Sequence, residues 1–340
     1  MATNSTPPTS TVTATPKAAA TSDPRDEVIA RVRVAILSLA LLFTLAGNTV
    51  VLKLVLQSRP KTVHLSRIYS FLLHLSAADI LVGICNILPQ LVWDIYFRFP
   101  LGDLACKAVK FLQVFVLYLS TYVLAGMAID RYLVIRSGVN RPPFVVRIIL
   151  AASWLVAAVF AMPQLFIFSL QQLPNGVQDC WATFKPPVTG LRYVMFFVTA
   201  VLVIPVAVMA FCYTYLCWAI SKRSLSDAKL RTIRMTMVMV LVFVLCWTPF
   251  CCAQLYLQYT GHMPSTFITI CLLVPNLNSC ANPWVCLTFS TSLRRRFREY
   301  AVVRIVYELL MVRRTRNVIT VSSLQYRRPT QAKRQLRAYR

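Results

Sequence analysis

Charged side chains are scarce in this sequence: Asp, Glu, Lys and Arg make up 14% of its 340 residues, and they occur in clusters. Five stretches of 19 to 31 residues contain no such charge, and each is long enough to cross a bilayer as a helix. A sixth, 235–293, is too long for one helix, and the turn-forming residues 260–264 divide it in two. Soluble proteins bury helices of about 10 to 14 residues, so an ordinary soluble fold is excluded. The pattern predicts an all-α membrane protein, a seven-transmembrane helix bundle with helices near 32–57, 66–95, 103–136, 144–167, 190–222, 229–258 and 265–290.

Acidic residues are scarcer still, with 11 Asp and Glu against 36 Lys and Arg, so the net charge is +25. The predicted first, third and fifth loops and the segment after Ser290 hold 27 of the 36 basic residues. By the positive-inside rule the N-terminus is extracellular and the C-terminus cytoplasmic, as in a multi-pass protein of the plasma membrane. The basic tail favours contact with anionic membrane lipid. Nucleic acid is not an expected partner, because no nucleic-acid-binding motif accompanies the tail.

The N-terminal tail lacks the apolar core of about 7 to 15 residues that defines a cleavable signal peptide. It is rich in Thr, Ser, Ala and Pro, so residues 1–31 are predicted to form a disordered extracellular tail. Asn4 begins an Asn-Ser-Thr glycosylation acceptor on that side. Residues 32–291 form the predicted transmembrane domain and 292–340 the cytoplasmic part, in which 292–310 has the pattern of an amphipathic helix on the membrane surface.

The residue patterns of an enzyme or a light-driven pump are missing. The last predicted helix, 265–290, has no lysine that could carry a retinal Schiff base. Asp79 has no second carboxylate beside it, and the three histidines lack partners at metal-ligand spacing, so neither a catalytic nor a metal site is predicted. A transporter would show internal repeats or broken helices in matching halves, which are not evident. Peptide transport stays the best alternative outside the receptors.

Asp79 is the acid deepest in a predicted span, and a carboxylate there is unfavourable unless it is paired, protonated or bound to a cation. Two interpretations stay open. Asp79 belongs either to an interhelical hydrogen-bond network or to a functional switch that holds an allosteric sodium ion, the one cofactor considered. The polar residues expected around it are Asn48, Ser120, Asn278, Ser279 and Asn282.

A second group of polar residues lies toward the extracellular ends of the predicted helices. Gln90 and Asp94 are four residues apart, and Lys110 and Gln113 three, so each pair shares one helix face. Any one of these side chains could instead contact lipid headgroups or join two helices. As a set they predict a polar cavity open to the outside, with glutamines suited to peptide amides. Its other expected members are Gln164 and Gln254, with Phe115, Trp247 and Phe250 as an apolar floor.

Cysteine placement provides a test of this topology. Cys106 and Cys180 lie at or beyond the outer ends of predicted spans, in the oxidising compartment, and can form a disulfide between the third helix and the following loop. The other nine of the eleven cysteines lie in apolar helices and are expected to be reduced packing residues. None follows Cys286, so no palmitoyl anchor is available beside the amphipathic helix.

Short motifs in the predicted helices resemble, in order, the landmarks of the rhodopsin-like G-protein-coupled receptors. Each motif alone is weak, but together they indicate that class over about residues 32–300. They are Gly47-Asn48, Leu75-Ser76-Ala77-Ala78-Asp79, Asp130-Arg131-Tyr132, Trp154, Pro205 with Tyr213, Cys246-Trp247-Thr248-Pro249 and Asn282-Pro283. A second set is similar to the vasopressin and oxytocin receptors: Leu88 to Asp94, Lys110 to Val114, Pro163-Gln164, Asp179 to Phe184 and Gln254.

The second resemblance implies an extracellular ligand that is a short, amidated peptide closed by a disulfide. It also implies a heterotrimeric G protein as partner, with the Gq route to calcium favoured, together with arrestin and a receptor kinase. Receptors for neuropeptide S or crustacean cardioactive peptide share the third-helix region and are the alternative within the class. The polar contacts implied for the peptide are Gln90, Lys110, Gln113, Gln164 and Gln254.

The resemblance further implies how a bound peptide acts. We expect it to favour a state in which the sixth helix, kinked at Pro249, moves outward. Trp247 is expected below the peptide, and Arg131, held at rest by Asp130, is expected to move toward Tyr213 and the G protein. An Arg131 that snorkels to the membrane surface is the alternative. The other residues expected in activation or coupling are Tyr132, Val139, Asn282 and Pro283.

Three positions depart from the family pattern. Arg33 stands near the start of the first helix, where those receptors commonly have an acid, so a basic residue in the peptide's tail would need Asp94 or Asp103 instead. Cys286 replaces the tyrosine that ends the seventh-helix motif, and altered basal activity is expected. Gly138 replaces a proline of the second intracellular loop, which leaves the choice of G protein open.

Overall fold

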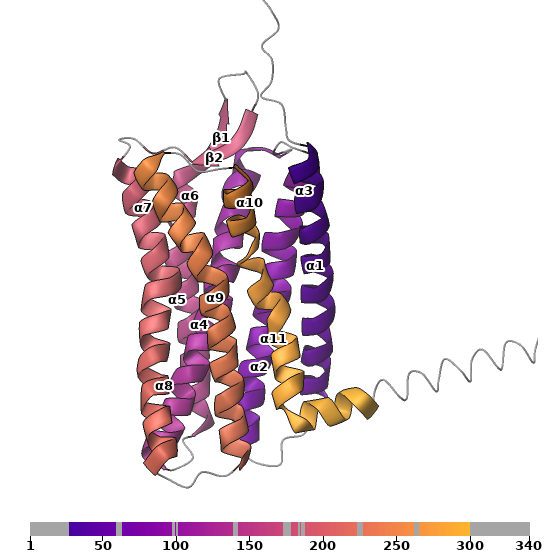
Figure 1. The fold of residues 1–340 in the computed structure, drawn as a ribbon, viewed down its shortest axis with the longest axis vertical. Coiled ribbons are helices and arrows are strands. Elements are labelled where there is room, and N and C mark those ends of the chain that lie inside the picture. Colours follow the sequence, from indigo (N-terminus) through magenta and orange to yellow (C-terminus); the bar gives the residue numbers. More distant parts are fainter. Residues whose placement is uncertain are drawn as a thin grey trace, which may run out of the picture.

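The computed structural model describes residues 27–58, 63–96, 99, 101–138, 142–172, 178–182, 184, 188–222, 227–261 and 265–299. Long helices run side by side along one axis, and a short hairpin stands at one end of the bundle (Figure 1). Among the described residues, six continuous helical segments are long and apolar enough to cross a membrane. We call the two ends of the molecule the hairpin end and the opposite end.

The spans agree with the predicted ranges to within five residues, and the predicted seven-helix fold is confirmed. The first three are α1 (Glu27–Leu56), then α2 (Val63–Val82) with η1 (Gly83–Ile87) and α3 (Leu88–Tyr96), then α4 (Asp103–Ser137). The last four are α5 (Pro143–Ala161) with α6 (Gln164–Ile167), α7 (Val188–Val198) with η2 (Thr199–Val203) and α8 (Ile204–Lys222), α9 (Asp227–Thr260), and α10 (Ser265–Leu273) with α11 (Asn276–Phe289).

Each interruption of a span lies next to a proline. The π-helical turns η1 and η2 end two residues before Pro89 and Pro205, respectively. The breaks between α5 and α6 and between α10 and α11 contain Pro163 and Pro275. Proline has no N–H to donate to the preceding turn, so the chain widens or breaks there. The seventh span is divided in this way into α10 and α11, of 9 and 14 residues.

The first helix begins at Glu27, five residues before its predicted start. Residues 27–31 are therefore helical, and the prediction that they belong to a disordered tail is wrong. An acid in the first turn is favourable because a helix N-terminus carries a partial positive charge. Asn4 and its glycosylation acceptor lie outside the described residues.

A two-stranded antiparallel hairpin, which the sequence analysis did not predict, follows α6. Strand β1 (Phe168–Gln172) pairs with β2 (Gln178–Ala182), and Leu170 lies opposite Cys180. Cys180 forms a disulfide with Cys106 in the first turn of α4, and their Cα atoms are 5.6 Å apart. The predicted disulfide is confirmed, and it ties the hairpin to the start of α4.

Helix α4, which forms the third span, lies at the centre of the bundle and contacts α2, α5, α8 and α9. Gly126 allows α5 to come close, since a Cβ there would lie 2.8 Å from Cγ2 of Ile149. Gly47 of α1 does the same for α11, where a Cβ would lie 2.9 Å from Cγ of Pro283. These two glycines are therefore needed for close helix packing.

Residues 291–299 form a further helix that turns away from the axis of α11 (Figure 1). Leu293 is fully buried against the bundle, whereas Arg294, Arg295 and Arg298 are exposed. This two-faced character agrees with the amphipathic helix predicted for 292–310. The remainder of that predicted helix lies outside the described residues.

Candidate functional site

A cavity of about 330 Å³ opens among the helices toward the hairpin end. Its volume lies in the range of about 300 to 1,000 Å³ that is typical of ligand pockets. Polar and apolar side chains share its wall, as such pockets require. The lining residues are Arg33, Asn86, Gln90, Lys110, Gln113, Val114, Leu117, Gln164, Phe168, Tyr193, Val194, Phe197, Trp247, Phe250, Gln254, Leu272, Leu273, Pro275 and Asn276.

The cavity brings together seven of the eight residues that the sequence analysis predicted as ligand contacts. The exception is Asp94, which does not line the cavity and instead forms an ion pair with Arg33, a lining residue. Their role in binding stays a prediction, but the geometry required for it is present. The seven are Gln90, Lys110, Gln113, Gln164, Trp247, Phe250 and Gln254.

Hydrogen bonds orient three of the glutamines. The Gln90 amide on α3 donates to Oδ1 of Asp94 at 3.1 Å. Gln113 on α4 donates to the backbone oxygen of Asn86 at 3.4 Å, and Gln164 on α6 donates to the hydroxyl of Tyr193. Three spans thus each direct one glutamine to the same cavity.

Aromatic rings form the deep end of the cavity. Phe197, Trp247 and Phe250 contact one another, with ring centroids 5.9 to 6.4 Å apart. Phe115 is not part of this group, so its predicted place in the floor is wrong. It stacks on Phe111 of the same helix, because Val114 and Leu117 occupy the face of α4 that lines the cavity.

Several lining residues were missed by the sequence analysis. The side-chain amide of Asn86 donates to Oδ1 of Asn276 at 2.9 Å, which joins η1 to α11 across the cavity wall. Asn86 lies four residues before Gln90, so helical spacing could have identified it. Phe168 and Tyr193 gave no such signal, because their positions depend on the hairpin and on the packing of α7.

At the middle of the bundle, three hydrogen bonds converge on the fully buried carboxylate of Asp79. The hydroxyls of Ser120 and Ser279 donate to Oδ1 at 2.7 and 2.8 Å. The Asn282 amide donates to Oδ2 at 2.8 Å. The hydrogen-bond network, one of the two interpretations of this residue, is thus observed.

Asn48 and Asn278 were also expected around Asp79, but neither forms a hydrogen bond with its carboxylate. Asn48 donates to the backbone oxygens of Thr44 and Ser279, at 2.9 and 3.0 Å, rather than to the carboxylate. Asn278 makes no bond to the carboxylate either. Within the described part of the chain, its Oδ1 and that of Asn282 are buried without a hydrogen-bond partner.

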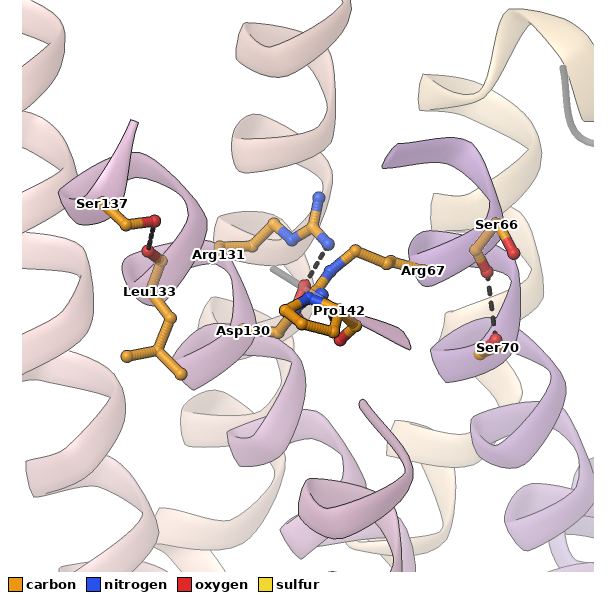
Figure 2. Close-up of polar contacts among 8 residues, drawn as sticks. All are labelled: Ser66, Arg67, Ser70, Asp130, Arg131, Leu133, Ser137 and Pro142. Carbon is orange, nitrogen blue, oxygen red and sulfur yellow. Dashed lines mark hydrogen bonds and ion pairs between the residues drawn. The ribbon is translucent and has the colours of Figure 1, made fainter. Parts of the chain in front are cut away.

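At the opposite end of α4, two arginines share the carboxylate of Asp130 (Figure 2). Arg131 donates to Oδ2, and Arg67, reaching across from α2, donates to Oδ1. Arg67 also approaches the backbone oxygen of Pro142 at 3.4 Å. The three charged side chains are at most 3% exposed. Arg131 is therefore inside the bundle, and the snorkelling alternative is wrong.

Arg67 was missed by the sequence analysis because it is 63 positions away from its partner and resembles an ordinary membrane-flanking cation. The other described residues that were predicted for activation lie at the same end or in the core. Tyr132 packs against the ring of Tyr215 on α8, with centroids 5.0 Å apart, and Tyr213 is buried on that helix. Val139 lies outside the described residues.

Comparison with known proteins agrees with this architecture. The family model described as 7 transmembrane receptor (rhodopsin family) matches residues 47–285. The vasopressin V1b receptor of Homo sapiens is 34% identical over a match that covers 80% of this chain and 76% of that receptor. The oxytocin receptor of Ovis aries is 38% identical, with 79% and 78% covered, and the mesotocin receptor of Rhinella marina is 36% identical, with 80% and 78% covered.

The chain therefore belongs to the rhodopsin family of seven-transmembrane receptors, in the group that contains the vasopressin and oxytocin receptors. The resemblance seen in the short motifs is confirmed. The family consists of G-protein-coupled receptors rather than enzymes. Together with the membrane-spanning helices of this chain, membership makes it a multi-pass protein of the plasma membrane.

Proposed function

We propose that this protein is a receptor for a vasopressin/oxytocin-type cyclic peptide and that it signals through Gq to raise cytosolic calcium. The observation that carries the proposal is the cavity in which glutamines from four spans meet above Trp247. A glutamine amide both donates and accepts hydrogen bonds, as the amides of a peptide require. The names of the relatives, receptors for vasopressin, oxytocin and mesotocin, support the same ligand class.

In this proposal the hairpin end faces the outside of the cell and the opposite end faces the cytoplasm. The excess of Lys and Arg in the predicted cytoplasmic segments supports this orientation. It puts the Cys106–Cys180 disulfide in the oxidising compartment, where such bonds persist. Asp130, with Arg67 and Arg131, then lies on the side where a G protein binds.

A peptide in the cavity would contact Trp247 and the neighbouring rings of Phe197 and Phe250 directly. Repacking of these rings would favour a state in which α9 moves outward, with Pro249 as the kink. At the cytoplasmic end, Arg131 would leave Asp130 and become available to the G protein. The ligand works by binding that state more tightly than the resting one.

A sodium ion beside Asp79 is a further part of the proposal. The carboxylate, the hydroxyl oxygens of Ser120 and Ser279 and the unpartnered amide oxygens of Asn278 and Asn282 are the hard oxygen ligands that such a cation prefers. A bound cation would neutralise a carboxylate that is fully removed from water.

We further propose that anionic lipid binds the exposed arginines of helix 291–299, since basic residues beside a membrane are attracted to its negative surface. A receptor kinase and arrestin are proposed to act on the tail that follows. Its candidate phosphoacceptors, Ser322, Ser323 and Thr330, lie outside the described residues. A phosphate there would add negative charge to a strongly basic segment.

The experiment that tests the proposed function measures calcium, with cyclic AMP in parallel, in cells that express this chain and receive vasopressin/oxytocin-type peptides. A saturable calcium response is expected, weakened by Gln113→Ala and lost in Arg131→Ala. Gln172→Ala, in an exposed glutamine of β1 outside the cavity, is the matched control. A response to neuropeptide S or crustacean cardioactive peptide alone would replace the ligand class. Peptide affinity that does not change with guanine nucleotide would exclude G-protein coupling.

A further inference from the structure

The charges on the cavity wall are all of one sign. Arg33 and Lys110 are the charged lining residues, and no Asp or Glu lines the cavity in the described part of the chain. The Lys110 ammonium lies 4.2 Å from the ring centroid of Trp93 and 5.4 Å from that of Phe168, which is cation–π geometry. Aromatic rings hold this cation in position, and the carboxylate of Asp179, which does not line the cavity, is close enough to attract it electrostatically.

Two of the described acids near the hairpin end, Asp103 and Asp179, already have partners. Asp103 pairs with Lys107 at 2.7 Å and accepts the backbone N–H of Leu170 at 2.8 Å. Asp179 accepts the backbone N–H groups of Phe99 and Cys180, at 3.0 and 2.9 Å. Asp103 is thus an unsuitable substitute for the missing acid of the first helix.

Asp94, the other suggested substitute, is held by Arg33 in a two-pronged ion pair. Nε of Arg33 donates to Oδ2 at 3.0 Å, Nη2 donates to Oδ1 at 2.8 Å, and Gln90 donates to the same Oδ1 at 3.1 Å. The arginine side chain is 26% exposed and that of the acid 10%. The cation, not the carboxylate, is therefore the partner that a ligand in the cavity meets.

We propose that the Arg33–Asp94 pair sets the charge specificity of the cavity, so that a peptide carrying an acidic side chain is preferred over the same peptide carrying a basic one. This inference rests on the proposed function and concerns the same site. Two cations on a partly desolvated wall attract a carboxylate and repel an ammonium or guanidinium group. Asp94 keeps the wall from being more strongly cationic, because it compensates part of the charge of Arg33.

The test uses three vasopressin/oxytocin-type peptides that are identical except for Glu, Gln or Lys at one position of the tail. Potency in the calcium assay is measured at matched surface expression. The unmodified receptor is expected to respond to all three, with the Glu peptide about tenfold or more ahead of the Lys peptide, the size expected for one charge pair that is partly shielded by water.

Two substitutions then move this ratio in opposite directions. Arg33→Gln removes a wall cation and releases Asp94, so the preference for the Glu peptide should fall to about threefold or less. Asp94→Asn leaves Arg33 uncompensated, so the preference should rise about threefold or more. Lys107→Gln, which changes a cation of the same end that does not line the cavity, is the control and should leave the ratio unchanged.

Opposite shifts with an unchanged control would support the proposal. If both variants weaken all three peptides equally, the pair only joins α1 to α3 and the proposal is wrong. A Lys peptide that equals or exceeds the Glu peptide on the unmodified receptor would refute it while leaving the proposed function intact. If the receptor is present at the cell surface but gives no calcium response to any of the three peptides, the ligand class is wrong, and this inference with it.

Discussion

Replacing Arg67 by methionine is expected to make the receptor harder to activate, although the substitution breaks an ion pair between two helices. Arg67 and Arg131 both donate to Asp130, and all three side chains are buried. When Arg131 leaves Asp130 during activation, Arg67 remains and keeps the carboxylate compensated. Without Arg67, the active state would contain a buried carboxylate that has lost its partner, which is strongly unfavourable.

The size of the effect follows from the contact that is lost. A hydrogen bond to a charged group is worth about 1.5 to 3 kcal/mol, and each 1.4 kcal/mol is a factor of ten. Arg67→Met should therefore shift the peptide concentration–response curve to about 10- to 150-fold higher concentrations. Basal signalling should fall as well. Without Arg67, the carboxylate of Asp130 is bound by Arg131 alone, which favours the resting state.

The assay is calcium release and basal inositol phosphate at matched surface expression. Arg147→Met, in an exposed arginine of α5, is the matched control and should behave like the unmodified receptor. In the double variant Arg67→Met/Asp130→Asn no carboxylate remains at position 130, so potency should recover. The unmodified receptor, Arg67→Met, Asp130→Asn and the double variant form a double-mutant cycle. Raised basal signalling in Arg67→Met alone would refute the reasoning, since Arg67 would then be a restraint on the resting state.

Three further substitutions test other parts of the molecule. Gln113→Ala should weaken peptide binding about 2- to 10-fold, the worth of one hydrogen bond; competition binding measures this, and an unchanged Kd would contradict a direct contact. Cys106→Ser should lower the stability of the purified receptor by about 2 to 5 kcal/mol, and a thermal transition equal to that of the unmodified protein would argue against this. Asp79→Asn should abolish any dependence of peptide affinity on sodium, whereas potassium should have no effect on either protein; persistence of the sodium effect would remove Asp79 from the site.

Local features of the sequence were sufficient for the spans and for part of the cavity. The length of an uncharged stretch decides whether it can cross a bilayer, because each unsatisfied charge in lipid is unfavourable wherever the other helices lie. Helical spacing likewise put Lys110 and Gln113 on one face of α4 without knowledge of its neighbours. The disulfide followed from topology, because Cys106 and Cys180 were expected on the oxidising side.

The tertiary structure decided the pairings between helices. Arg33 meets Asp94 across 61 positions, and Arg67 meets Asp130 across 63. Such pairs depend on how each helix is rotated and how far it is shifted along its neighbour, and those variables are fixed by packing rather than by local pattern. The same rotation moved Phe115 away from the cavity. The sequence alone determined a seven-helix membrane receptor, and only the packed bundle decided which charges its cavity presents to a ligand.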